Sequence, residues 1–373
     1  MLLVAALLLH SYIRGFFYPA LCGFLFGYIM QRSRFCFAAG FRDIFLIRNT
    51  TMARAILLVL GLTTSAFALI YALTNGAVHL NINPAGLHTV AAGLIFGFGM
   101  VIAGNCVSGC LMRMGEGYLM QWITFTGLLA GSAAGAWHLG WWYQFSISRS
   151  PAIFLPDYLG WLPSLALQLT LLLLLYLLAW RYERKSGLAR LSREKFSLHH
   201  AASRFKSIFT ARSWPYSAGA AGLALINSLL LYLWGSPWGI TGGLTYFSGW
   251  LSAQAGFNPE RWHYFEGLLY TGDNRIFLDH PFIHLAAAMI GGSFLSSLLH
   301  HEFRLRRPRS RKYLLSALAG GILMGYSSRV ALGCNIGGFL GGVSSLSLHG
   351  WVFGLAILAG TYLGGKFFLR YLL

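Results

Sequence analysis

The chain consists largely of long apolar blocks separated by short polar or glycine-rich segments. A helix that crosses a bilayer needs about 20 apolar residues, and nine blocks approach that length. They cover residues 16–31, 52–74, 87–103, 121–143, 160–180, 216–234, 281–299, 313–328 and 349–371. The blocks are continuous and lack the alternation of membrane β-strands. Because lipid accepts only helices or closed barrels, the pattern predicts an all-α polytopic membrane protein with about nine transmembrane helices.

Four glycine-rich segments interrupt these blocks. They are Ser33–Phe41, Gly104–Gly117, Trp238–Tyr246 and Leu332–Val343. Irregular backbone at membrane depth is tolerated only where protein buries it or where it lines a cavity. The segments therefore predict short broken or re-entrant helices, and they are where function is expected.

Composition agrees with a membrane protein. Hydrophobic residues make up 56 % of the chain and charged residues only 10 %, against about 25 % charged in an ordinary soluble domain. The mean hydropathy is +0.60. These values exclude a soluble enzyme, a disordered protein and a coiled coil.

The net charge of +18 is concentrated in two loops. Residues 181–212 hold nine Lys or Arg and two Glu, and residues 302–312 hold six Lys or Arg and one Glu. Such loops between apolar spans follow the positive-inside rule and are interpreted as cytoplasmic. They can also attract anionic lipid. No basic face with interleaved aromatic side chains accompanies these runs, so nucleic-acid binding is not expected.

The chain contains an internal repeat. Gly93, Gly97, Ala103, Cys106 and Gly109 match Gly321, Gly325, Ala331, Cys334 and Gly337 at an offset of 228 residues, and Trp122, Gly131 and Gly135 match Trp351, Gly360 and Gly364 one residue further on. Ser33–Gly40 aligns with Ser236–Gly243. We therefore expect an N-terminal half at 1–180 and a C-terminal half at 214–373, joined by a basic cytoplasmic linker at 181–213.

Loop charge predicts that the two halves are inverted. With the loops 42–54, 181–212 and 302–312 inside, the loop 74–88, which lacks Lys and Arg, falls outside. Span 87–103 then runs inward and its repeat partner 313–328 runs outward. Inverted repeats place a substrate site near the bilayer midplane, where the N-termini of broken helices point at anions.

Three of the five cysteines lie in the glycine-rich segments near predicted helix starts. These are Cys36, Cys106 and Cys334, and Gly239 takes the corresponding position in the fourth segment. Cys22 lies within a span and is interpreted as a packing residue. Cys110 shares a helical face with Cys106, so a disulfide or a metal half-site there is a secondary interpretation.

Neutral thiols at these positions suit an anion that contains sulfur. A buried thiol away from cations stays protonated and can donate a weak S–H hydrogen bond, and helix N-termini attract anionic oxygens. A series of weak binding sites lets the anion move on, whereas a single tight site would trap it. Around these motifs Arg34, Arg113 and Arg329 add positive potential, either as functional groups or by snorkelling to the interface.

The remaining charges carry no catalytic motif. We expect Asp43 and Glu116 to pair with Arg42 and Arg113. No nucleotide-binding loop, zinc-protease motif or nucleophile elbow is present. Neither a cofactor nor a metal is predicted, and the chain is not expected to be an enzyme.

These motifs resemble those of the YeeE/YedE family of membrane sulfur transporters. The resemblance covers Gly23–Gly27, Gln31–Cys36, Gly40–Asp43, Ala103–Gly109, Arg113–Gly117 and Gly333–Gly337, and is greatest to the thiosulfate-uptake branch. It implies an hourglass-shaped, pseudo-twofold protein of the bacterial inner membrane that passes thiosulfate between Cys36, Cys106 and Cys334. It also implies a small cytoplasmic sulfurtransferase-like (TusA-type) partner.

The predicted substrate path extends beyond the three thiols. It consists of Cys36, Gly104, Asn105, Cys106, Gly109, Gly239, Gly333, Cys334 and Gly337, with Arg34, Cys110, Arg113 and Arg329 in a second group. Asn105 departs from the two glycines usual in the family, which leaves another sulfur or selenium species open as the substrate. A membrane thiol–disulfide protein using Cys106 and Cys110, or a structural subunit of a larger assembly, are the alternatives from other classes.

Overall fold

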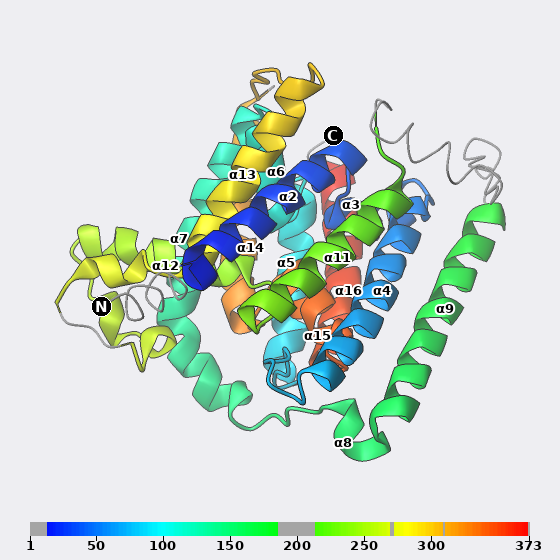
Figure 1. Ribbon diagram of the computed structural model, residues 1–373. Helices are drawn as coiled ribbons and strands as arrows, with labels where there is room; N and C mark the ends of the chain where they lie inside the picture. Colours follow the sequence, from blue (N-terminus) through cyan, green and yellow to red (C-terminus); the bar gives the residue numbers. More distant parts are fainter. Residues whose placement is uncertain (1–12, 186–212, 269–271, 309, 372–373) are drawn as a thin grey trace.

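A computed structural model describes residues 13–185, 213–268, 272–308 and 310–371 of the chain (Figure 1). Of the predicted linker at 181–213, residues 186–212 lie outside this part. The described residues fold into helices and contain no β-strand beyond two isolated bridges. The predicted all-α class is therefore confirmed.

The described part of the first half contains ten helical segments. They are η1 (Ile13–Phe17), α2 (Tyr18–Ser33), α3 (Phe37–Leu46), α4 (Thr51–Leu73), α5 (Leu87–Ile102), α6 (Val107–Gly115), α7 (Leu119–Trp142), η2 (Tyr143–Ile147), α8 (Leu155–Leu159) and the long α9 (Trp161–Lys185). The second half contains α11 (Tyr216–Trp234), α12 (Ile240–Gln254), η5 (Pro259–Arg261), η6 (His263–Phe265), η7 (Asn274–Phe277), α13 (Pro281–Leu299), α14 (Arg311–Val330), η8 (Asn335–Gly341), α15 (Gly342–Ser344) and α16 (Leu348–Tyr371).

Six helical spans in the described residues are long and apolar enough to cross a membrane. They are α4, α5 together with α6, α9, α11, α13 and α16, and a seventh results if α14 and the segment 335–344, bent by 42°, count as one. The chain is thus a multi-pass membrane protein, but the predicted number of nine is not confirmed. The segment at 16–31 forms α2, which has only 16 residues. The segment at 121–143 forms the 24-residue α7, whose polar and glycine residues lower its hydropathy.

The helices of one half pack mainly on helices of the other half. α5 packs on α16, and α14 packs on α7. α2 packs on α13, and α11 packs on α4 (Figure 1). Each pair therefore joins elements distant in sequence, and the short helices α3, α6, α12 and η8 are held among these long ones.

Close approach of the backbones at two of these crossings requires glycine. A Cβ atom on Gly360 of α16 would lie 2.2 Å from the Leu94 carbonyl oxygen of α5. A Cβ atom on Gly131 of α7 would lie 2.1 Å from the Ile322 carbonyl oxygen of α14. Lipid tails are as apolar as the helix surfaces, so no hydrophobic effect drives membrane helices together. Small residues at such crossings let the backbones approach closely, and this close packing stabilises the contact instead.

Candidate functional site

The three cysteines of the glycine-rich segments each occupy the N-cap of a short helix. Cys36 precedes α3, Cys106 precedes α6 and Cys334 precedes η8, all with extended backbone. Gly239 is the N-cap of α12. At Cys106 the thiol sulfur also accepts a hydrogen bond from the Gly109 N–H at 3.4 Å. The first N–H groups of a helix lack intrahelical partners, so each N-cap lies beside backbone donors.

The thiols of Cys36 and Cys106 are neighbours. They lie within hydrogen-bonding reach of each other, and the Cys36 thiol donates to Asn105 Oδ1 at 3.7 Å. Asn105 and Cys106 are almost fully buried. A Cβ atom on Gly109 would lie 3.2 Å from Asn105 Oδ1, so this glycine leaves the polar cluster uncovered on one side.

A cavity of about 150 Å³ reaches this cluster. Cys36, Gly104 and Asn105 line it together with Arg34 and Arg113. Five of the predicted site residues, from two of the glycine-rich segments, therefore surround one hollow. Arg42 and Asp43 also line it. Three guanidinium groups against one carboxylate make it suitable for an anion.

A second cavity, of about 280 Å³, is lined by Gly239, Gly333, Gly337 and Arg329. Arg329 is 4 % exposed, and its Nη1 donates to the hydroxyl of Tyr264 at 2.8 Å. A Cβ atom on Gly337 would lie 3.2 Å from the Trp238 carbonyl oxygen, so η8 and the start of α12 meet closely there. Three of the five predicted glycines and the third arginine thus gather at this separate site, while Gly109 lines neither cavity.

The two cavities use equivalent positions of the repeat. Cys36 in the first corresponds to Gly239 in the second, and Asn105 corresponds to Gly333. Gly104 and its counterpart Leu332 both have left-handed backbone, with φ of 79° and 57°. Cys106 and Cys334, which hold equivalent positions at the starts of α6 and η8, follow one residue after the lining positions 105 and 333.

Comparison with known proteins agrees with this geometry. A family model described as sulphur transport matches residues 32–363. The chain belongs to this family. Membership confirms that the protein is a transporter and not an enzyme, and it confirms the resemblance drawn from the motifs.

Two relatives named as thiosulfate transporters match most of the chain's length, and a third matches less than half of it. The chain is 31 % identical over 370 residues to the thiosulfate transporter TsuA of Spirochaeta thermophila. This match covers 92 % of the chain and 96 % of that protein. The chain is 29 % identical over 341 residues to TsuA of Escherichia coli, covering 89 % and 88 %. The probable transporter YedE of Escherichia coli is 31 % identical over 164 residues, which cover 44 % of this chain and 40 % of YedE.

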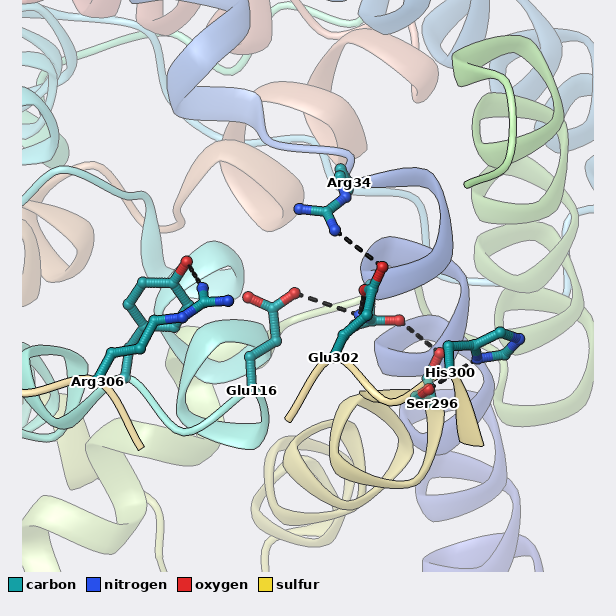
Figure 2. A network of polar contacts seen from close by, with 8 residues as sticks. Arg34, Glu116, Ser296, His300, Glu302 and Arg306 are labelled. Atoms are coloured by element: carbon teal, nitrogen blue, oxygen red, sulfur yellow. Dashed lines mark hydrogen bonds and ion pairs between the residues drawn. The ribbon is translucent and has the colours of Figure 1, made fainter. Parts of the chain in front are cut away.

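A polar network adjoins the first cavity of the transporter (Figure 2). Gln31, 1 % exposed, donates through Nε2 to Glu302 at 2.7 Å and to Glu116 at 3.4 Å, and accepts from Ser296 at 2.6 Å. Arg34 forms an ion pair with Glu302 at 3.0 Å. The network therefore ties the end of α2 to α6 and to the loop between α13 and α14.

Arg34 lies between two cavities. Besides the hollow at Cys36, it lines a cavity of about 310 Å³ with His301, Glu302, Arg304 and Arg306. Its own backbone is left-handed, with φ of 50°, where α2 ends and the chain turns toward Cys36. The side chain that pairs with Glu302 is thus also the link between the cysteine cluster and a basic surface hollow.

Of the two predicted arginine–carboxylate pairs, one forms an ion pair and the other does not. Arg42 pairs with Asp43 at 2.8 Å, as predicted. Arg113 instead lies over the ring of Tyr118, 4.9 Å from its centroid, and Glu116 hydrogen-bonds Gln31. Glu116 follows the membrane-capable segment Leu87–Gly115, and its burial raises the pKa of this carboxyl above the ordinary 4.5, although Arg113 acts to lower it.

The other cysteines are separate from the cavities. Cys110 is buried in α6 and its thiol donates to the Gln121 carbonyl at 3.2 Å. Cys22 is buried in α2. All five thiols are free, and within the described ranges no cluster of three His, Cys, Asp or Glu residues could hold a metal ion.

Several lining residues were not predicted from the sequence. In the second cavity these include Asn81, whose N–H donates to Ser345 Oγ at 2.9 Å and whose side-chain amide donates to the Gly337 carbonyl. Tyr264 and His280 line the same cavity. The only available signal was the polar pair Asn81 and Asn83 in a loop without Lys or Arg.

Proposed function

We propose that the chain imports thiosulfate, or a close sulfur anion, across the bacterial inner membrane. The observation that carries this proposal is the pair of arginine-lined cavities at equivalent repeat positions, each beside thiol- or glycine-capped helix starts. The names of two relatives that share most of the chain's length support thiosulfate as the substrate.

The proposed path begins at the second cavity. The loop 74–86, which contributes Asn81 there, lacks Lys and Arg and is assigned to the outside. Arg42 and Asn49 line the first cavity and belong to a basic loop assigned to the cytoplasm. The anion would thus pass Arg329, then Cys334, Cys106 and Cys36 in turn, and leave past Arg34.

Transfer between the thiols needs no covalent change. Each neutral S–H donates a weak hydrogen bond to the terminal sulfur of the anion, while N–H groups at the helix starts bind its oxygens. Since each thiol contributes only a weak hydrogen bond, binding at each step stays weak enough for release to the next site. In this proposal the glycines Gly104, Gly109, Gly239, Gly333 and Gly337 keep the path open.

The two halves are proposed to be inverted copies spanning the membrane, with nine crossings once α2 and α7 are included. The exchange of packing partners between halves supports this arrangement, because α5 packs on α16 as α14 packs on α7. The proposed boundaries are residues 1–180 and 214–373, with a cytoplasmic linker at 181–213. The hourglass shape belongs to the same proposal.

Uptake of labelled thiosulfate into proteoliposomes tests the proposed substrate and thiols. We expect Cys36→Ala, Cys106→Ala and Cys334→Ala each to reduce uptake at least tenfold, and Cys22→Ala, a buried thiol outside the path, to retain it. Sulfate, sulfite and selenite serve as competitors. Normal thiosulfate uptake by all three variants would refute the relay. Preferential uptake of selenite would show that selenite, and not thiosulfate, is the substrate.

The acceptor on the inner side is proposed to be a small sulfurtransferase-like protein of the TusA type. The basic hollow of Arg34, Arg304 and Arg306 lies where the anion would emerge. Binding of such a purified protein to the reconstituted transporter, abolished by Arg304→Glu with Arg306→Glu, would support this acceptor. Unchanged binding by that variant would exclude the hollow as its docking site.

A further inference from the structure

The helix α9 lies along one edge of the molecule (Figure 1). Polar contacts at two places along α9 attach it to the other helices. Toward one end, Gln168 Nε2 donates to the Val343 carbonyl at 2.5 Å and Trp351 Nε1 donates to Gln168 Oε1 at 3.2 Å. Toward the other, Glu183 accepts from Thr50 Oγ1 at 2.6 Å and forms an ion pair with Arg54 at 2.9 Å. These anchors are 15 residues apart, which is roughly 22 Å along a helix.

Between the anchors α9 stands off from the bundle and leaves a cavity of about 540 Å³. Its walls come from α3, α4, α9 and α16, with Phe339 of η8, and their side chains are apolar except near Thr50 and Tyr182 at one end. The anchors at both ends prevent α9 from closing this space. The volume is that of an ordinary small-molecule site, and in a bilayer the abundant apolar occupant is a lipid chain.

Charge at the Thr50 and Tyr182 end indicates the kind of lipid. The two carboxylates there, Asp43 and Glu183, are already paired with Arg42 and Arg54. Four further cations are exposed at the same end. Arg184 lies over the ring of Trp180, which leaves Arg48, Arg181 and Lys185. An excess of basic side chains beside the mouth of an apolar cavity attracts a negatively charged headgroup.

We propose that this cavity binds one acyl chain of an anionic phospholipid, with the lipid phosphate at Arg48, Arg181 and Lys185. The buried end of the chain contacts Phe41 of α3 and Phe339 of η8, whose rings lie 5.4 Å apart. These are the helices that Cys36 and Cys334 begin. The lipid therefore braces two short helices from different halves, whichever anion the protein carries.

Native mass spectrometry of the full-length protein in mild detergent tests the site with phosphatidylglycerol and phosphatidylethanolamine as probes. Ala179→Trp fills the cavity from the α9 wall, whereas Leu173→Trp adds the same bulk at a 58 % exposed position outside it. We expect wild type and Leu173→Trp to retain one tightly bound phosphatidylglycerol. Ala179→Trp should bind it at least tenfold more weakly, with a melting temperature equal to that of wild type stripped of lipid.

A second variant and a second readout keep the test decisive if Ala179→Trp folds poorly. Arg48→Gln with Lys185→Gln should remove the preference for phosphatidylglycerol while leaving one lipid bound. A phosphatidylglycerol with a photoreactive acyl chain should label peptides from 175–182 and 354–358. Equal lipid binding by both tryptophan variants, or labelling spread evenly over the lipid-facing helices, would overturn the site. An unchanged preference in the Gln variant would overturn the headgroup assignment.

Discussion

Asn105 accepts a hydrogen bond from the Cys36 thiol through Oδ1 at 3.7 Å. It is 2 % exposed overall and touches the first cavity. In the proposed cycle the Cys36 S–H must turn from this amide to the arriving anion. The amide thus gives the thiol a partner in the empty state, which lowers the cost of burying an unpaired polar group.

Substitutions at Asn105 separate this polar role from simple bulk. Asn105→Leu keeps a similar volume but removes the acceptor, so we expect thiosulfate uptake to fall at least tenfold. Asn105→Gly removes both and restores the residue usual in the family, so uptake should stay within about threefold of wild type. Initial rates in proteoliposomes provide the measurement. Wild-type uptake by both variants would show that Asn105 acts through neither bulk nor polarity, and an equal loss in both would show that the acceptor alone matters.

Burial of Glu116 makes a prediction about pH. Because its pKa is raised in the folded protein, ionisation is less favourable there than in the unfolded chain, and wild-type stability falls as pH rises above about 4.5. Glu116→Gln cannot ionise. We expect equal melting temperatures near pH 4 and a variant that is more stable by on the order of 1–3 °C at pH 7. A variant less stable than wild type at pH 7 would contradict this.

Residue types and spacing predicted the thiol positions but not their polar neighbours. A cysteine flanked by glycines between two apolar blocks is a local pattern, and the N-caps Cys106 and Cys334 follow from it. The contact of Gln31 with Glu302 joins residues 271 positions apart. No local pattern carries that information, because the contact depends on how α2 packs against α13.

At the scale of helices, the crossings of α5 with α16 and of α7 with α14 depend on close backbone contact. Gly360→Ala places a Cβ atom 2.2 Å from a backbone carbonyl that cannot move alone. We expect it to destabilise the protein by about 1–3 kcal/mol. Gly131→Ala should cost a similar amount, since its Cβ atom would meet the equivalent carbonyl at 2.1 Å. Thermal unfolding in detergent measures both.

Gly291→Ala is the matched control for these crossings. Gly291 also lies within a long helix, α13, but no atom lies within 4 Å of its Cβ position. Alanine is favoured over glycine in a helix by up to about 1 kcal/mol, so this variant should be as stable as wild type or slightly more so. Equal losses in all three variants would mean that glycine flexibility, and not close packing, matters at the crossings.

Hydropathy predicted the long helices, but for two of them length and composition alone do not confirm a membrane crossing. α4, α11, α13 and α16 lie within a few residues of the expected blocks. α2 is too short for a span by length alone, and α7 is too polar by composition. Both pack on long helices of the other half. A helix shielded by protein needs fewer apolar residues than one surrounded by lipid, so hydropathy is least informative for such elements.

At the scale of the whole molecule, the packing of the halves is reciprocal. α2 lies on α13 as α11 lies on α4, and α3 contacts α16 as α12 contacts α7. When the repeats are aligned, each contact between two helices corresponds to a contact between their counterparts in the other half. Additions unique to one half, such as α8 with α9 and the segment between α12 and α13, lie outside this exchange.

The inverted arrangement predicts opposite accessibility for equivalent loops. Ala77, before α5, and Ser310, before α14, are both exposed and precede equivalent helices of the repeat. In spheroplasts treated with a membrane-impermeant maleimide, Ala77→Cys should be labelled from outside and Ser310→Cys only after lysis. The native thiols are buried, so wild type provides a low background.

A second pair of loops makes the same prediction independently. Ile47 follows α3 and Phe257 follows α12, the equivalent helix, and both side chains are exposed. Inversion requires Phe257→Cys to react from outside and Ile47→Cys only after lysis. Labelling of Ala77→Cys and Ser310→Cys from the same side would instead make the halves parallel copies. The two cavities would then open on one face, and no path through Cys334, Cys106 and Cys36 could cross the membrane.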